Sequence, residues 1–367
     1  MEFKPIKFTN SQNKEFVAVL RERVNQYFKD HNISTYGNIS MFVKMVFMLL
    51  LYFIPYGLSV AGVITNLWIL LPLWIVMGFG MAGIGFSVMH DANHGSFSKN
   101  ERVNRYIGFV INIVGGFALT WQIQHNTLHH SYTNIDGYDE DINPGKLLRF
   151  SPHKPRYWAH RFQHIYGWFL YGLMTLSWST DKDFVQLIRY KRQGYKLSAH
   201  SSFRRLMVEL VGLKVGYFTY MLVIPMLFMP VPWWQILILF FAMHYVCGFL
   251  LGIVFQTAHV METSAYPLPN EGGNVENSWA VHQLATTSDF APKNRWLSWF
   301  IGGLNYQVEH HLFPNICHVH YPKIAPIVKQ TALEFNLPYN VHATFIKALW
   351  KHGRMLRMLG RYDALPV

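Results

Sequence analysis

Charged residues are missing from two long stretches of this 367-residue chain. No Asp, Glu, Lys or Arg occurs from Met45 to Met89 (45 residues) or from Val215 to Met261 (47 residues). Charged residues make up 14% of the chain and hydrophobic residues 51%, whereas about a quarter of a typical soluble domain is charged. Since one membrane crossing takes roughly 20 residues, each charge-free stretch is long enough for two. We therefore expect an integral membrane protein.

Cysteine is almost absent as well. Cys247 and Cys317 are the only two in the sequence, which leaves no disulfide framework and no thiolate metal site to consider. The first 40 residues are polar, with no apolar segment near Met1. We expect no cleavable signal peptide, and the first span then acts as the membrane signal.

Each charge-free stretch contains its own turn. Pro and Gly interrupt the first at IPYGLSVAGVITN and the second at FMPVPWW. The predicted fold class is all-α integral membrane, with four transmembrane helices arranged as two hairpins and a cytoplasmic helical cap that holds a histidine-rich dimetal site. A single domain, 1–367, would divide into an N-terminal arm (1–40), hairpin 1 (41–89), a polar segment (90–205), hairpin 2 (206–260) and a C-terminal segment (261–367).

The positive charges predict the orientation in the membrane. All 32 Lys and Arg lie outside the two stretches: seven in residues 1–44, sixteen in 90–214 and nine in 262–367. By the positive-inside rule, both termini and the long middle segment lie on the cytoplasmic side, of a bacterial inner membrane or of the endoplasmic reticulum. The net charge of +12 then suits anionic lipid headgroups or an acidic electron donor, and no nucleic-acid partner is needed. In the arm, Phe16, Leu20, Val24 and Tyr27 or Phe28 recur at helical spacing, which predicts an amphipathic helix lying on the membrane or on the cap.

Seven of the 19 histidines fall into three short motifs. HDANH contains His90 and His94, HNTLHH (125–130) contains three histidines, and QVEHH contains His310 and His311 after Gln307. Spacings of three and four residues place side chains on one face of a helix. All three motifs lie outside the charge-free stretches, where the orientation argument puts the cytoplasmic boundary.

Clustered imidazoles of this kind indicate metal binding. Imidazole suits Zn, Cu, Fe and Ni, and the lack of nearby thiolates argues against structural zinc. Seven imidazoles exceed one tetrahedral shell, so two metal ions are the economical interpretation. The chain has no Glu-x-x-His, which ferritin-like di-iron bundles use, and no His-Glu-x-x-His of the zincins.

These motifs resemble the three histidine boxes of the membrane fatty acid desaturases, specifically the front-end type, whose third box begins with Gln. The similarity extends through WQIQHNTLHHSYTN (121–134), the acidic DED at 139–141 and NYQVEHHLFP (305–314). From about residue 40 to 325 the order of spans and boxes also matches.

The resemblance implies two non-haem iron ions that activate O2, and removal of two hydrogens from an acyl chain. The metal must do this step, because an unactivated C–H bond is beyond side-chain chemistry. Two electrons per turnover must come from a donor; since the chain has no haem-binding HPGG motif, a separate cytochrome b5 or ferredoxin is expected. The implied metal ligands are His90, His94, His125, His129, His130, His259, His310 and His311.

Three of the candidate site residues rest on weaker grounds. His259, in FQTAHVMET, occupies the place of a family histidine at the end of the fourth span. Gln307 could bind iron directly, through water, or only orient a neighbour. Asp91 could accept a hydrogen bond from a ligand imidazole or serve only at a helix end.

Other polar residues are not expected to bind metal. His282, in WAVHQLATTSDF, is not expected to be a ligand, and Asp289 stands where relatives often have Asn, which puts a polar role there in doubt. His244 is expected to be a neutral, hydrogen-bonded residue between helices. His318 and His320 are expected at the surface. The segment YGWFLYGLMTLSW (166–178) could lie flat on the membrane, which is favoured, or line an acyl channel.

The predicted activity is a front-end acyl desaturase that inserts a cis double bond into an acyl-CoA or phospholipid acyl chain. A hydroxylase or ketolase on the same scaffold is the alternative. A transport or metal-binding protein would show polar residues through several spans, and almost none are present.

Overall fold

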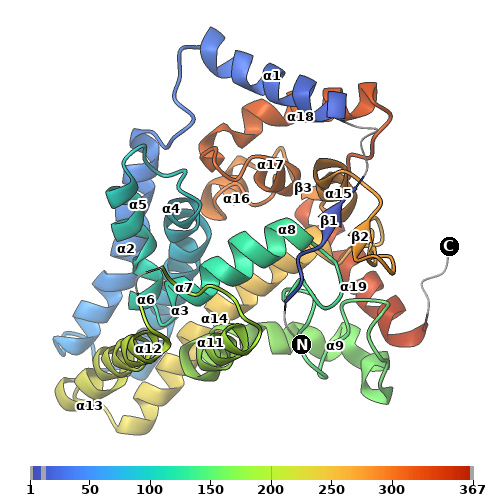
Figure 1. The fold of residues 1–367 in the computed structure, drawn as a ribbon. Helices are drawn as coiled ribbons and strands as arrows, with labels where there is room; N and C mark the ends of the chain where they lie inside the picture. Colours follow the sequence, from blue (N-terminus) through green and yellow to red (C-terminus); the bar gives the residue numbers. More distant parts are fainter. Residues whose placement is uncertain (1–2, 10–13, 200, 364–367) are drawn as a thin grey trace.

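The computed structural model describes residues 3–9, 14–199 and 201–363, and the fold is almost entirely helical (Figure 1). Four helical segments are long and apolar enough to cross a membrane: Ile39–Val60, Leu67–Asn93, Phe203–Phe228 and Trp233–His259. This confirms the four expected apolar spans. A bent pair of helices, Glu101–Ile113 and Ala118–Tyr132, turns by 111° at its break, and its second arm carries HNTLHH.

Two of the four spans contain π-helical turns. The spans are α2 (Ile39–Val60); α3 (Leu67–Gly83) with the π-helical η1 (Ile84–Met89) and α4 (His90–Asn93); α12 (Phe203–Phe218) with the π-helical η5 (Thr219–Val223) and α13 (Ile224–Phe228); and α14 (Trp233–His259). Short connections, 61–66 and 229–232, join the first span to the second and the third to the fourth. The side chain of Asn66 caps α3 by accepting a hydrogen bond from the Trp68 amide (2.9 Å), as expected at a helix start.

The second and fourth spans form the centre of the bundle. A Cβ on Gly78 would lie 2.7 Å from the Met243 carbonyl oxygen, so only glycine permits this approach of α3 to α14. Apolar side chains from both helices, among them Trp74, Met77 and Leu251, are buried in the largest hydrophobic cluster of the described residues. This rigid pair supports the residues that follow α3 and those that end α14.

The remaining elements lie outside the four spans. The helices before the third span are α1 (Lys14–Asp30), α5 (Glu101–Gly108), α6 (Val110–Ile113), α7 (Ala118–Gln122), η2 (Ile123–His129), α8 (His130–Tyr132), η3 (Trp158–Phe162), α9 (Gln163–Gly172), α10 (Met174–Ser177), η4 (Trp178–Lys182) and α11 (Asp183–Arg192). After the fourth span come α15 (Trp279–Thr286), α16 (Arg295–Phe300), α17 (Gln307–Leu312), η6 (His318–His320), α18 (Tyr321–Glu334) and α19 (Phe345–Arg361). Two short parallel pairs join β1 (Lys7–Phe8) to β2 (Asn274–Val275) and β3 (Asp289–Phe290) to β4 (Val341–His342).

The amphipathic helix expected in the N-terminal arm is present as α1. It lies across α18 in Figure 1, and its apolar face packs on that helix in a shared cluster that contains Phe16, Leu20, Ile324 and Val328. The prediction of an amphipathic helix is therefore confirmed, and its apolar face is covered by protein.

Candidate metal centre

Two local features of the backbone present the histidines. His90 and His94 lie where the second span continues past its π-helical turn into α4. His125 and His129 lie within η2, and His130 follows directly. A π-turn places residues i and i+5 in register, and the Nε2 atoms of His125 and His130 are 3.3 Å apart. Such turns are frequent at functional sites.

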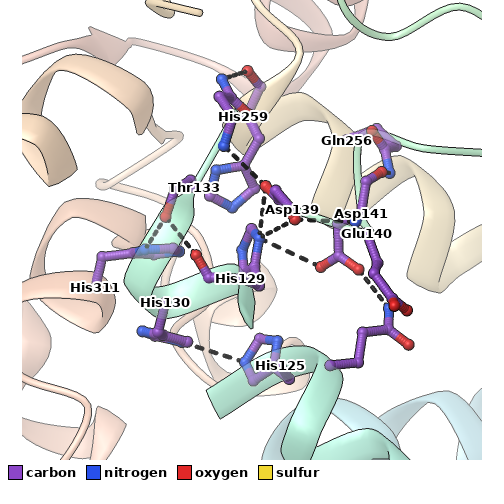
Figure 2. Close-up of polar contacts among 12 residues, drawn as sticks. His125, His129, His130, Thr133, Asp139, Glu140, Asp141, Gln256, His259 and His311 are labelled. Atoms are coloured by element: carbon purple, nitrogen blue, oxygen red, sulfur yellow. Dashed lines mark hydrogen bonds and ion pairs between the residues drawn. The ribbon is translucent and has the colours of Figure 1, made fainter. Parts of the chain in front are cut away.

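All eight histidines predicted as ligands come together. One group contains His90, His94, His125 and His310; a second contains His129, His259 and His311; within each group the nearest ring nitrogens all lie within 4.8 Å of one another. His130 lies between them, with its Nε2 3.0 Å from that of His310 and its ring stacked on His311 at 4.3 Å. Figure 2 shows part of this arrangement.

The imidazole nitrogens fit metal ligation. Ligands about 2.0–2.1 Å from one ion lie roughly 3 Å apart, and the Nε2 atoms of His90 and His125 are 3.1 Å apart. Among the described residues, Nε2 of His94, His259 and His311 is buried without a hydrogen-bond partner. Buried polar atoms are nearly always paired, so these nitrogens are available to a cation. Burial and neighbouring imidazoles lower the pKa of His310 and His311 well below the usual range, which keeps both rings neutral with free lone pairs.

A carboxylate orients one of these rings. Nδ1 of His129 donates to Asp139, with both carboxylate oxygens at 3.1 Å (Figure 2). Burial alone would lower the pKa of His129, but Asp139 and Asp141 raise it to about 9, so a metal ion that binds at Nε2 would displace a proton from that atom. The carboxylate in turn accepts the backbone N–H of Asn134 and of Asp141. A carboxylate that holds Nδ1–H leaves Nε2 pointing to a metal.

Other ligand candidates are held in the same way. His311 Nδ1 donates to Gln283 Oε1 (2.8 Å), and that oxygen also accepts from Thr133 (2.9 Å). His310 Nδ1 lies 3.3 Å from the Tyr321 hydroxyl. The sequence did not predict a role for Asp139, Gln283 or Tyr321. Asp139 belongs to the DED motif and Gln283 directly follows His282. Only the fold shows which imidazole each one meets.

Gln307 and Asp91 have different surroundings. Gln307 is buried beside His259 in the second group, and its side chain interacts with that imidazole. Asp91 hydrogen-bonds Ser96 (3.1 Å) and the His318 imidazole, whose Nε2 accepts from Lys44 (2.7 Å). Among the described residues, Asp91 accepts no hydrogen bond from any of the eight clustered imidazoles, so the structure does not show it holding a ligand N–H.

The surface placement of His318 and His320 was wrong. Their exposed fractions are 4% and 9%, because the 3₁₀ turn η6 packs against the loop between α1 and α2. The Cys317 amide donates to the Thr35 carbonyl (2.9 Å), and His320 Nε2 contacts the Tyr36 carbonyl (3.1 Å).

The remaining polar residues separate from the centre. His282 is buried but belongs to none of the histidine groups among the described residues. His244 hydrogen-bonds Tyr217 (2.6 Å) and Thr175 (3.1 Å), which confirms the interhelical role. Asp289 does have a polar role: it accepts from the Val308 amide (3.0 Å) and the Tyr339 hydroxyl (2.6 Å) at the start of α17, so the doubt about it was unfounded.

A cavity of about 620 Å³ opens beside His125. Its apolar lining includes Phe150, Leu170, Tyr171 and Phe255, and its polar lining includes Gln124, Glu140, Asp141, Lys182, Gln186, Arg189 and Gln256. The segment 166–178 contributes to the apolar lining, while Phe169 on the same segment is exposed. The less favoured interpretation of this segment, as channel lining, is thus the one that the cavity supports.

Fold and site together define a polytopic membrane protein with two adjoining histidine groups that could hold metal, beside a largely apolar cavity. The model of the family described as fatty acid desaturase matches residues 66–343. The chain belongs to the fatty acid desaturase family, and it is an oxidoreductase that desaturates fatty acyl chains. The resemblance seen in the histidine motifs is confirmed.

Three relatives illustrate the match. An sn-1 linoleoyl-lipid 6-desaturase of Arthrospira platensis is 37% identical over 94% of this chain and 92% of the relative. A protein of the same description from Synechocystis sp. is 34% identical over 97% and 98%. An acyl-lipid (8-3)-desaturase of Physcomitrium patens is 37% identical over 97% of this chain and 74% of the relative.

Proposed function

We propose that this chain is a front-end acyl-lipid desaturase that uses two iron ions, O2 and two external electrons. The convergence of eight imidazoles from four separate segments beside an apolar cavity carries the proposal. The similarity to enzymes described as linoleoyl-lipid 6-desaturases supports an 18-carbon acyl chain on a membrane lipid as the substrate. The new cis double bond would form between an existing one and the carboxyl end.

The two histidine groups assign ligands to two ions. His90, His94, His125 and His310 would hold one, and His129, His259 and His311 with the Gln307 amide oxygen would hold the other, with His130 between them. The bound iron pair supplies the oxidising power that removes hydrogen from an unactivated methylene, which side chains alone cannot provide. Imidazole and amide ligands are neutral, so the centre would keep a net positive charge, and coordination positions would remain open for oxygen.

The residues around the centre bind and orient. Trp121 stacks on His125 with ring centroids 4.6 Å apart, and both line the cavity. An acyl chain in that cavity would pass the first group of histidines with water excluded by Phe255 and Tyr171. Arg189, a half-exposed residue of the polar lining, suits the ester and headgroup end of a lipid.

The topology belongs to the same proposal. Short connections between the first and second spans and between the third and fourth favour two hairpins, and the distribution of Lys and Arg favours a cytoplasmic cap, with both termini on that side. A separate cytochrome b5 or ferredoxin would deliver the electrons there.

Expression in a host fed linoleate, with a compatible electron donor, tests this proposal. We expect a new 18-carbon acid with one more double bond, located by mass spectrometry of derivatised fatty acids, in lipids rather than in the acyl-CoA pool. Hydroxy acids in its place would establish the hydroxylase alternative, and a new bond on the methyl side of the existing ones would contradict the front-end assignment.

A further inference from the structure

Trp178 separates the acyl cavity from a second, smaller one. A space of about 20 Å³ lies behind it, lined by residues of η1, α14 and the loop after α6, among them Gly85, Cys247 and Leu251. Of the described residues that line the two spaces, Trp178 is common to both. The smaller space has room for about one water-sized group, and its wall is almost entirely apolar.

The partition lies where the two cavities meet. Trp178 packs against a buried cluster of Met89, Ile111 and Trp121, and Trp121 stacks on His125. An acyl chain whose polar end lies at the half-exposed Arg189 and whose body passes His125 would meet the Trp178 indole with its methyl-side segment. The smaller cavity continues the same apolar path between the second and fourth spans.

A buried lysine anchors the backbone at Trp178. Nζ of Lys214, on α12, donates to the backbone carbonyl of Trp178 (2.6 Å), to the carbonyl of Gly115 (2.7 Å) and to Asp183 (2.6 Å). Lys182 lies 4.5 Å from the centre of the Trp178 ring on the cavity side. Lys214 thus joins α12 to η4, to the start of α11 and to the loop at Gly115.

We infer that Trp178 sets how much of the acyl chain fits beyond the metal centre, and so selects chain length. This inference rests on the proposed function. Replacement of the indole by a methyl group joins the two cavities and admits additional methylenes. Each methylene that a pocket accepts or rejects changes discrimination about tenfold or more.

The test compares Trp178→Ala with the wild type in cells fed equal amounts of linoleate and its 20-carbon homologue. The ratio of 20-carbon to 18-carbon product should rise about tenfold or more, and Trp178→Phe should change it in the same direction by less. Trp158→Ala is the matched control, because Trp158 is 74% exposed and lines neither cavity; its ratio should equal that of the wild type.

A second readout does not depend on catalysis. Cells are fed a fatty acid with a terminal diazirine, irradiated, and the labelled peptides are identified by mass spectrometry. Label should move from Met174 and Trp178 in the wild type to the α14 peptide with Cys247 and Leu251 in Trp178→Ala. If Trp178→Ala fails to accumulate, Trp178→Phe decides the matter by the same two measurements.

The two proposals fail in different ways. A wild type that makes no new double bond contradicts the proposed function, and the label still reports where the chain ends. A wild type that desaturates, with an unchanged product ratio and an unchanged label position in the Trp178 variants, overturns the role of Trp178.

Discussion

The imidazole of His311 shows how each predicted ligand is prepared for its task. Its Nδ1 is engaged by Gln283, and its buried Nε2 has no partner within the described chain. His129 is held by Asp139 in the same sense. At this scale the fold fixes the tautomer, and a metal needs no rearrangement of the rings to bind.

Replacement of either ring should therefore remove iron. We expect His129→Ala and His311→Ala to lose bound iron, measured by plasma mass spectrometry of purified protein, and to lose desaturation below detection. His31→Ala, at an exposed histidine of the arm, is the control and should keep both. Full iron content in the two variants would show that the ligand assignment is wrong.

Asp139 should matter without being a ligand. Loss of an outer hydrogen-bond partner typically costs 10- to 100-fold in metal affinity or activity, so we expect Asp139→Asn to fall in that range and to recover partly with excess iron. Asp136→Asn, in the same loop, removes only a partly exposed pair with Lys154 (3.2 Å) and should behave like the wild type. Equal losses in both would point to a general effect on the loop.

Gln307 offers a graded test of direct ligation. An imidazole at this position is a stronger ligand than an amide, so Gln307→His should retain iron, whereas Gln307→Leu should lose the ion held beside His259. Iron content and product formation are measured together. If Gln307→Leu keeps both, the amide oxygen does not bind iron.

The residues that the sequence revealed are those whose partners lie within one or two turns. His90 and His94, or His310 and His311, belong to local motifs whose spacing is visible in the chain. Asp139 was missed because a non-helical turn, ten residues after His129, brings it to that ring. Gln283 and the Asp91–His318–Lys44 chain were missed because they depend on contacts between separate segments, 28 residues apart for Gln283 and His311 and 227 for Asp91 and His318. Such pairings follow from tertiary structure and have no local signal.

At the scale of elements, one buried ion pair joins α12 to the start of α11. Lys214 and Asp183 are both buried, with Nζ and Oδ2 2.6 Å apart, and Asp183 also accepts from Thr120 (2.6 Å). Each charge of a buried ion pair compensates the other, so removal of one partner leaves a buried, uncompensated charge that destabilises the fold. The contact therefore locks α11 and η4 to the third span.

We expect Lys214→Met to lower stability by about 3–5 kcal/mol, seen as a lower temperature of half-inactivation in detergent. Lys214→Met combined with Asp183→Leu should be less destabilised than the sum of the two single variants, because no unpaired charge remains. Additive losses would mean that the two groups are not coupled.

Prediction of elements succeeded where hydrophobic pattern dominates. The four spans and the amphipathic α1 follow directly from the distribution of apolar residues. The π-helical turns η1 and η2 were not predicted, since the histidine spacing was interpreted with an ordinary helical period. A wider turn has no distinct sequence pattern, because it depends on tertiary packing.

At the scale of the whole molecule, the orientation in the membrane stays a prediction, and so does the division into arm, hairpins and polar segments. Cysteine labelling tests the orientation, because Cys247 and Cys317 are buried and should not react. In sealed spheroplasts, Val63→Cys, in the connection between the first two spans, should react with an impermeant maleimide, and Lys99→Cys should react only after lysis. The reverse pattern would place the histidine groups outside the cell.

The wide turn η2 has a consequence for how this chain can vary. Between Ile123 and His129 the rings are brought into phase by a backbone that carries an extra residue relative to an ordinary helical repeat. Loss of a single residue there would swing everything after it by about 100° around the helix axis, and both ions would lose donors at once. The centre thus tolerates exchange of side chains around it far better than any change in the length of this short turn.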